Sequence, residues 1–380
     1  MAIALAIPTY GIVLIGTGPL LQGVFYLVYL MGLIFIWQHR RSLYFSYALM
    51  LTTLVFFAAW IIPNLITHAS GRIESEALSL PVLMYHVCVL LIVILWQRSW
   101  TLNSTHPRRS LQALAKPLLI LITPLVILII AESLRLTFEF PDQRPDPFNY
   151  RHLVGEVFLM FLIASLAVPS RWIKVAAVMA SVIGLHLIEN RGGLLSVGVV
   201  AALYVIPYLL KRVGRRRLMG ACVGLVLFSM VFFEYLYQLI DIFFLIENQQ
   251  RGLGSGFTHR LPIWIEAWHE IQRVPWTGVG FWVSPFPFHD VNPDTAVHNA
   301  FLRVWVENGT FLFGVIMGVL IAAAVQIERK KLDVHRAAFF GILVYYFFLP
   351  RHLTLNPLSI LLYLTIIQAL CLPSKKSNDL

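Results

Sequence analysis

Long apolar stretches recur from one end of the chain to the other, and each ends at a basic cluster or a polar loop. A soluble protein can bury a few such stretches, whereas a dozen of them must face lipid or one another. We therefore expect an all-α polytopic membrane protein with about 12 transmembrane helices, forming a single integral membrane domain over residues 1–380. The predicted spans are residues 2–16, 20–37, 43–63, 80–97, 117–131, 153–169, 173–189, 192–210, 218–237, 299–326, 337–349 and 357–372.

Composition and charge support this interpretation. Hydrophobic residues make up 58% of the chain and charged residues only 13%, about half the charged share of an ordinary globular domain. Most of the 29 lysines and arginines fall in short loops on one side of the predicted bundle, among them Arg40, Arg41 and the run Arg215–Arg217. The positive-inside rule makes that side cytoplasmic, together with both termini. The net charge of +10 is thus a topology signal and needs no nucleic-acid partner.

The cysteines offer neither a disulfide framework nor a metal site. Cys88, Cys222 and Cys371 each lie inside a predicted span and far from one another in sequence. We predict that they are small core residues.

One outer loop, residues 238–298 between the ninth and tenth spans, is much longer than an ordinary connection and is expected to be periplasmic. Long loops of this kind carry function. Within it, Leu261–Arg273 (LPIWIEAWHEIQR) predicts a short interfacial helix with its tryptophans at headgroup level. The apolar face comprises Ile263, Trp264, Ala267, Trp268 and Ile271. This helix is either a passive lid or one wall of a lipid-carrier site.

Two arginines lie close to this predicted helix. Arg260 directly precedes it, and Arg251 lies in the glycine-containing stretch QQRGLGSGFTHR, where the backbone can approach a ligand closely. After the helix, Gly278 and Gly280 in VPWTGVGFW predict a tight turn.

The loop closes at His298. Asp294 or Thr295 can cap the tenth span, which puts His298 in or near its first turn. The positive end of the helix dipole disfavours protonated imidazole, and neutral imidazole is what a general base requires. The alternative is an ordinary interfacial histidine. Glu307 falls roughly on the opposite face, and an i, i+4 pair with Arg303 accounts for it.

A further arginine, Arg191, follows LHLIEN at the outer mouth of the seventh span. Charge at such a position is costly unless the side chain reaches water or has a function. Interfacial anchoring and ligand binding are both open, and Glu189 can neutralise the charge.

Taken in order, ENRGG, HRLPIWIEAW, VPWTGVGFW and HNAFLRVWVENGTFLFG resemble the superfamily of O-antigen ligases and O-antigen polymerases. The motifs lie within Glu189–Gly314. The resemblance implies about twelve spans, a large outer loop, and transfer of a glycan from undecaprenyl diphosphate with no cofactor, metal or nucleotide sugar. It also implies that Arg191 and Arg260 hold the carrier diphosphate and that His298 activates the acceptor hydroxyl. Arg251 has no match in these motifs and is a weaker candidate.

The resulting hypothesis is an inverting glycosyltransferase that moves O-antigen onto lipid A-core at the periplasmic face, among membrane lipids. The single dominant outer loop favours a ligase, and a polysaccharide polymerase with the same donor chemistry is the alternative. The absence of any Asp-x-Asp sequence disfavours a metal-dependent mechanism. A secondary transporter or lipid flippase is the second alternative; it would use Glu156 and Glu234, which we interpret as helix-end carboxylates near the outer interface.

Overall fold

The computed structural model describes residues 109–139, 151–213, 253–279, 297, 299–329, 333–348 and 357–371, and their regular structure is entirely helical. The helices are α5 (Arg109–Glu139), α6 (Arg151–Ala167), α7 (Arg171–Leu187), α8 (Arg191–Val213), α11 (Leu253–Arg273), α12 (Ala300–Arg329), α13 (Asp333–Phe347) and α14 (Pro357–Cys371).

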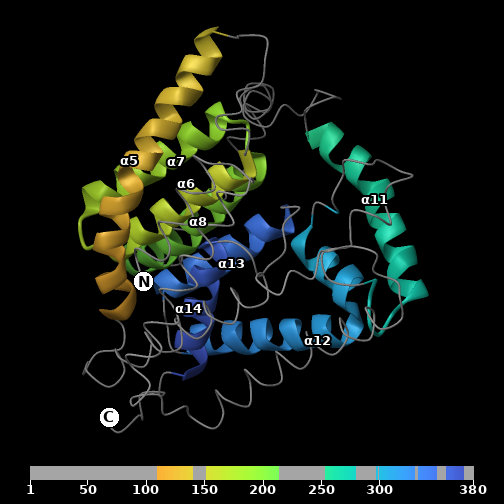
Figure 1. Cartoon of the computed structure of the whole chain (residues 1–380). Coiled ribbons are helices and arrows are strands. Elements are labelled where there is room, and N and C mark those ends of the chain that lie inside the picture. Colours follow the sequence, from red (N-terminus) through yellow and green to blue (C-terminus); the bar gives the residue numbers. More distant parts are fainter. Residues whose placement is uncertain are drawn as a thin grey trace, which may run out of the picture.

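The helices that follow one another along the chain pack side by side. Helix α6 packs against α5 and α7, and α13 packs against α8, α6, α12 and α14, whereas α11 contacts α12 at the edge of the bundle (Figure 1). One large apolar core runs through α5–α8 and α12–α14, and its bulkiest fully buried members include Phe158, Phe339, Tyr345 and Tyr346. A smaller, separate core joins α11 to the beginning of α12.

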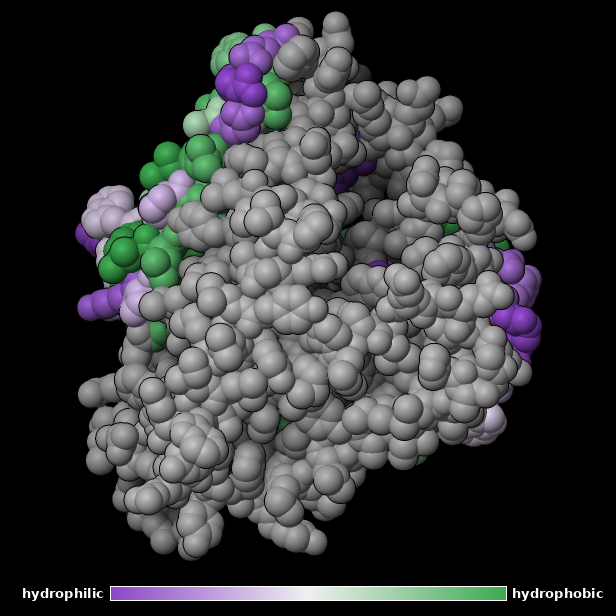
Figure 2. All heavy atoms as spheres, in the orientation of Figure 1, coloured by the Kyte–Doolittle hydropathy of each residue, from purple (hydrophilic) through white to green (hydrophobic). Residues whose placement is uncertain are grey.

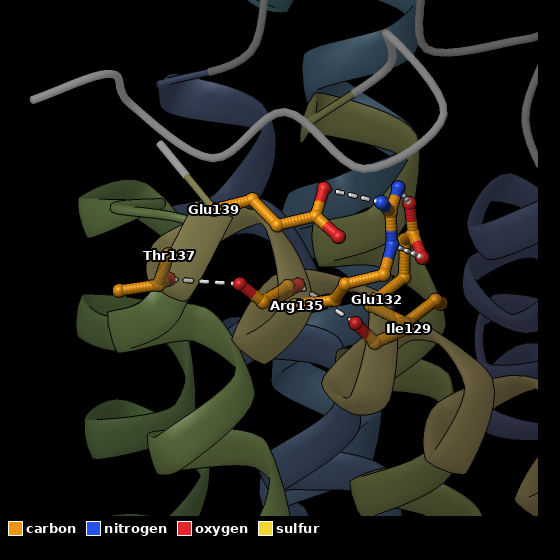
Figure 3. A network of polar contacts seen from close by, with 6 residues as sticks. Ile129, Glu132, Arg135, Thr137 and Glu139 are labelled. Atoms are coloured by element: carbon orange, nitrogen blue, oxygen red, sulfur yellow. Dashed lines mark hydrogen bonds and ion pairs between the residues drawn. The ribbon is translucent and has the colours of Figure 1, made fainter. Parts of the chain in front are cut away.

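The outer face of the bundle is apolar. Helix α5 exposes Ile120, Ile127 and Phe138, each more than 60% accessible, and Figure 2 shows a hydrophobic strip along this helix that ends in hydrophilic residues. That polar end is formed by Arg135, which lies between Glu132 and Glu139 and pairs with both at 2.5 Å (Figure 3). The segments Leu114–Glu139 and Ala300–Arg329 are long and apolar enough to cross a membrane. Large apolar side chains remain stable at a surface of this kind when lipid covers them.

Helices α5, α6, α7, α8, α12, α13 and α14 lie where spans were predicted, which confirms the helical pattern there. The predicted spans 2–16, 20–37, 43–63, 80–97 and 218–237 lie outside the described residues, so the total of twelve stays a prediction. Helix α5 extends beyond the predicted span 117–131 at both ends. It contains Pro117 and Pro124 and continues past both.

Helix α12 was predicted as one continuous span, and this is wrong. It breaks at Gly309, whose φ of 77° and ψ of 176° are far from helical values. Figure 1 shows the two halves of α12 at a clear angle, with α11 beside the N-terminal half.

The turn that follows α11 fills this break. In a continuous helix the Thr310 N–H would donate to the Val306 carbonyl. Here the Thr310 N–H donates to the Pro275 carbonyl at 2.7 Å, and the Val306 carbonyl accepts from the Val279 N–H at 2.9 Å. Both backbone groups released by the break are therefore satisfied by residues 275–279. A buried backbone group left without a partner would cost about 1–3 kcal/mol, so the turn and the break stabilise each other.

The two glycines at this contact are required by the close approach of the two backbones. Gly278 has a φ of 71°, and a Cβ built on it would lie 2.5 Å from the Glu307 carbonyl oxygen. A Cβ on Gly309 would lie 2.2 Å from the Trp276 carbonyl oxygen. The predicted tight turn around Gly278 is thus confirmed, and the glycine allows this turn to pack into the break of α12. Gly280 lies outside the described residues.

The Gly309→Ala variant should therefore be less stable than the wild type. The backbone angles at this position are nearly exclusive to glycine, so we expect a loss of at least about 2 kcal/mol and a clear fall in the thermal unfolding midpoint in detergent. Gly314→Ala and Gly318→Ala are matched controls on the same helix, because a Cβ at either position meets nothing within 4 Å. Their stability should stay equal or rise slightly. Equal midpoints for Gly309→Ala and Gly314→Ala would show that the break is not a structural requirement.

Candidate functional site

The sequence ENRGG forms the junction between α7 and α8. Helix α7 ends before Glu189, which has a left-handed φ of 51°. Asn190 then caps α8, because its side-chain oxygen accepts from the Gly193 N–H at 2.9 Å and its carbonyl accepts from the Leu194 N–H at 3.0 Å. Arg191 is the first residue of α8.

This junction packs on the last turn of α13. The Asn190 amide donates to the Tyr345 hydroxyl at 3.3 Å, and both residues are buried. Gly192 faces Phe348, whose Cβ lies 2.9 Å from a Cβ placed on the glycine. The end of α13 therefore fixes the position of Asn190 and Gly192, the two neighbours of Arg191.

Arg191 itself is partly buried at this junction, ahead of the predicted span. Its guanidinium Nη2 is buried and has no hydrogen-bond partner among the described residues. Burial lowers the pKa of Arg191 from its ordinary value, and the negative charge of Glu189 opposes that shift. An arginine stays charged despite such a shift, so a cationic donor remains available at the start of α8.

Helix α11 begins at Leu253, eight residues earlier than predicted, and this places Arg260 inside the helix rather than before it. The glycine-containing stretch is helical from Leu253 onward, and further along α11 Ile263, Ala267 and Ile271 bury one face of the helix in the smaller core. The predicted apolar face is confirmed for these three residues, whereas Trp268 is 46% exposed.

Arg260 lies one helical turn before Trp264 and on the same face of α11. The Trp264 ring meets Phe347 edge to face, with ring centroids 6.0 Å apart. Phe347 is the last residue of α13, and Phe348 after it is the residue that faces Gly192. The start of α8, with Arg191, and the turn of α11 that follows Arg260 thus both contact the end of α13.

His298 lies outside the described residues, but both of its neighbours are fixed. The Val297 carbonyl accepts from the Trp264 indole N–H at 3.0 Å. On the other side, the Asn299 side-chain oxygen accepts from the N–H groups of Phe301 and Leu302, each at 3.0 Å.

Asn299 is therefore the cap of α12, and the prediction of a cap at Asp294 or Thr295 is wrong. An asparagine directly before the helix satisfies its first N–H groups, so the helix begins at Ala300. His298 immediately precedes this cap in sequence, so it falls near the first turn of α12 and not within it.

The predicted pair of Arg303 and Glu307 is confirmed, and it is a buried pair rather than a surface one. Arg303 Nε donates to the Glu307 carboxylate at 2.7 Å, and the two side chains are 7% and 0% exposed. They lie in the N-terminal half of α12, directly before the break at Gly309. Because the two charges neutralise each other, this part of α12 can be buried where the turn 275–279 packs against it.

The remaining candidates are less informative. Glu156, predicted as a carboxylate at a helix end near the outer interface, lies in the first half of α6 and is only 1% exposed, so it is packed among the helices. It lies next to Gly155, which packs against Asn190 and Tyr345. Arg251 and Glu234 lie outside the described residues.

Comparison with known proteins agrees with the predicted resemblance. Residues 175–317 match the family model described as O-antigen ligase (Wzy_C). The matched segment includes α8, α11 and the first part of α12, and all of the motifs that carried the resemblance lie within it. A search among curated proteins gave no match. The match indicates a glycosyltransferase of the O-antigen ligase or polymerase type and, with the apolar helices, a membrane protein.

The buried pair should be one of the most sensitive polar contacts in this region. Glu307→Ala leaves the Arg303 charge without its carboxylate inside the fold, and we expect a loss of about 3–5 kcal/mol. Glu139→Ala is the matched control, because Arg135 and Glu139 have the same spacing and order but are 51% and 45% exposed. That control should unfold like the wild type. Similar unfolding midpoints for the two variants would contradict the burial of the Arg303–Glu307 pair.

Proposed function

We propose that the protein is an O-antigen ligase, which transfers a glycan from undecaprenyl diphosphate to lipid A-core at the periplasmic face of the bacterial inner membrane. Support comes from the family match over residues 175–317 and from the environment of Arg191. The observation that carries the proposal is the buried guanidinium nitrogen of Arg191, which has no partner in the described part of the chain. A buried donor of this kind is stabilised by an anionic ligand.

In this proposal Arg191 and Arg260 bind the diphosphate of the carrier. A diphosphate diester carries about two negative charges, and the planar guanidinium group can bind its oxygens in a bidentate manner. The shared contact of α8 and α11 with the end of α13 supports the pairing of these arginines in one site. Arg251, which has no match in the motifs that carry the resemblance, is a weaker candidate for the same role.

His298 is proposed to accept the proton of the acceptor hydroxyl. The acceptor oxygen attacks the anomeric carbon of the donor sugar, and the bond from that carbon to the phosphate oxygen breaks. The diphosphate leaves with the bonding electrons, and the two arginines stabilise the negative charge that develops on it. Attack opposite to the leaving group inverts the anomeric configuration. No metal ion is required, because the guanidinium groups supply the positive charge.

Single substitutions test this assignment in a ligation assay with purified protein, undecaprenyl diphosphate-linked glycan, lipid A-core and a chelator. We expect ligated product from the wild type in the presence of chelator. His298→Ala should lower kcat at least about a hundredfold, as loss of a general base does. Arg191→Ala and Arg260→Ala should each lower kcat/KM by about a hundredfold or more.

The control for Arg260 is Arg273→Ala, since Arg273 lies on the same helix, is 68% exposed and pairs with Glu270. This variant should retain wild-type activity. Full activity in the three site variants would exclude the site, and product formed only after a divalent metal is added would exclude the mechanism. Elongation of the carrier-linked glycan without lipid A-core would identify a polymerase instead, whereas movement of the carrier lipid without a new glycosidic bond would identify a flippase.

A further inference from the structure

Trp264 makes two different contacts, one through its aromatic ring and one through its indole N–H. Its ring packs edge to face on Phe347 at the end of α13, at 6.0 Å between centroids. Its N–H donates to the Val297 carbonyl at 3.0 Å. The first contact holds α11 against the bundle, and the second reaches the segment that leads into α12.

The carbonyl that accepts this hydrogen bond belongs to the peptide bond joining Val297 to His298. A hydrogen bond to that oxygen fixes the orientation of the peptide plane from which the next residue departs. Val297 is fully buried in the smaller core, so the bond is shielded from competing water. Asn299, on the far side of His298, is fixed as the cap of α12.

We propose that Trp264 is a positioning residue for His298, acting through its indole N–H on the Val297 carbonyl. This inference rests on the proposed function, in which His298 takes the proton of the acceptor. A base must be held within hydrogen-bond reach of the hydroxyl it deprotonates, so a small loss of orientation lowers the rate of the chemical step. Binding of the donor diphosphate depends on the arginines and is not affected.

The test is Trp264→Phe, which keeps an aromatic ring to pack on Phe347 and removes the N–H donor together with one of the two fused rings. We expect kcat for ligation to fall about three- to tenfold, in keeping with the loss of one hydrogen bond. The KM for the donor, and the Kd for undecaprenyl diphosphate without glycan, should stay within about twofold of the wild-type values. A wild-type kcat, or a loss that appears only in the donor KM, would overturn the proposal.

Two tryptophans provide matched controls. Trp305 also donates an indole hydrogen bond in the same core, to the Thr310 hydroxyl at 2.9 Å, so Trp305→Phe removes a comparable bond that does not touch the peptide before His298. Trp268 contacts Trp305 ring to ring at 5.7 Å, and Trp268→Phe keeps an aromatic ring there. Both variants should keep kcat within about twofold of the wild type. An equal loss of kcat in Trp305→Phe and Trp264→Phe would show a general effect on the core and overturn the proposal.

A second variant covers the case in which Trp264→Phe folds poorly. Replacement of Trp264 by 3-benzothienylalanine keeps both fused rings and substitutes sulfur for the N–H group, so that packing is retained while the donor is lost. It should show the same fall in kcat, and wild-type activity in it would overturn the proposal. His298→Ala in the same assay distinguishes failure of the proposed function from failure of the positioning role. If His298→Ala is fully active, the proposed function fails. If His298→Ala is inactive and Trp264→Phe is fully active, only the positioning role of Trp264 is refuted.

Discussion

The exchange of two backbone hydrogen bonds at the break of α12 is the constraint on which this region depends. Gly309 releases the Thr310 N–H and the Val306 carbonyl, and the turn after α11 accepts the first and donates to the second. Because neither the break nor the turn can satisfy its backbone groups alone, they form together. Helix α11, which leads into the turn, is thereby attached to the beginning of α12, and the buried Arg303–Glu307 pair adjoins the same contact.

This attachment brings three parts of the chain that are distant in sequence to the end of one helix. The junction that begins α8 packs on the end of α13 through Asn190 and Gly192, and α11 packs on the same end through Trp264. The peptide before His298 is bound by that same tryptophan. The residues proposed to bind the diphosphate and to activate the acceptor therefore lie on segments that are held by the same contacts.

The sequence predicts the helices of the described region well, because long apolar runs specify spans regardless of their neighbours. It also anticipates the Arg303–Glu307 pair and the buried face of α11, both of which follow from helical periodicity. It does not predict the break at Gly309, since an apolar helix tolerates glycine and only the partner turn reveals why the residue is needed. The cap of α12 at Asn299 and the start of α11 at Leu253 depend on tertiary packing and on a competition between capping residues, which local patterns do not resolve. The connection between Trp264 and the peptide preceding His298 had no signal in the sequence beyond the aromatic face.

The central claim is that Arg191 and Arg260, which are far apart along the chain, bind the same diphosphate. The most direct measurement is an experimental structure of the protein in lipid nanodiscs with undecaprenyl diphosphate bound. We expect the diphosphate to lie between the two guanidinium groups, at the end of α13, with His298 facing the position of the anomeric carbon. A diphosphate bound elsewhere, or in contact with one of these arginines while the other lies remote from it, would contradict the account.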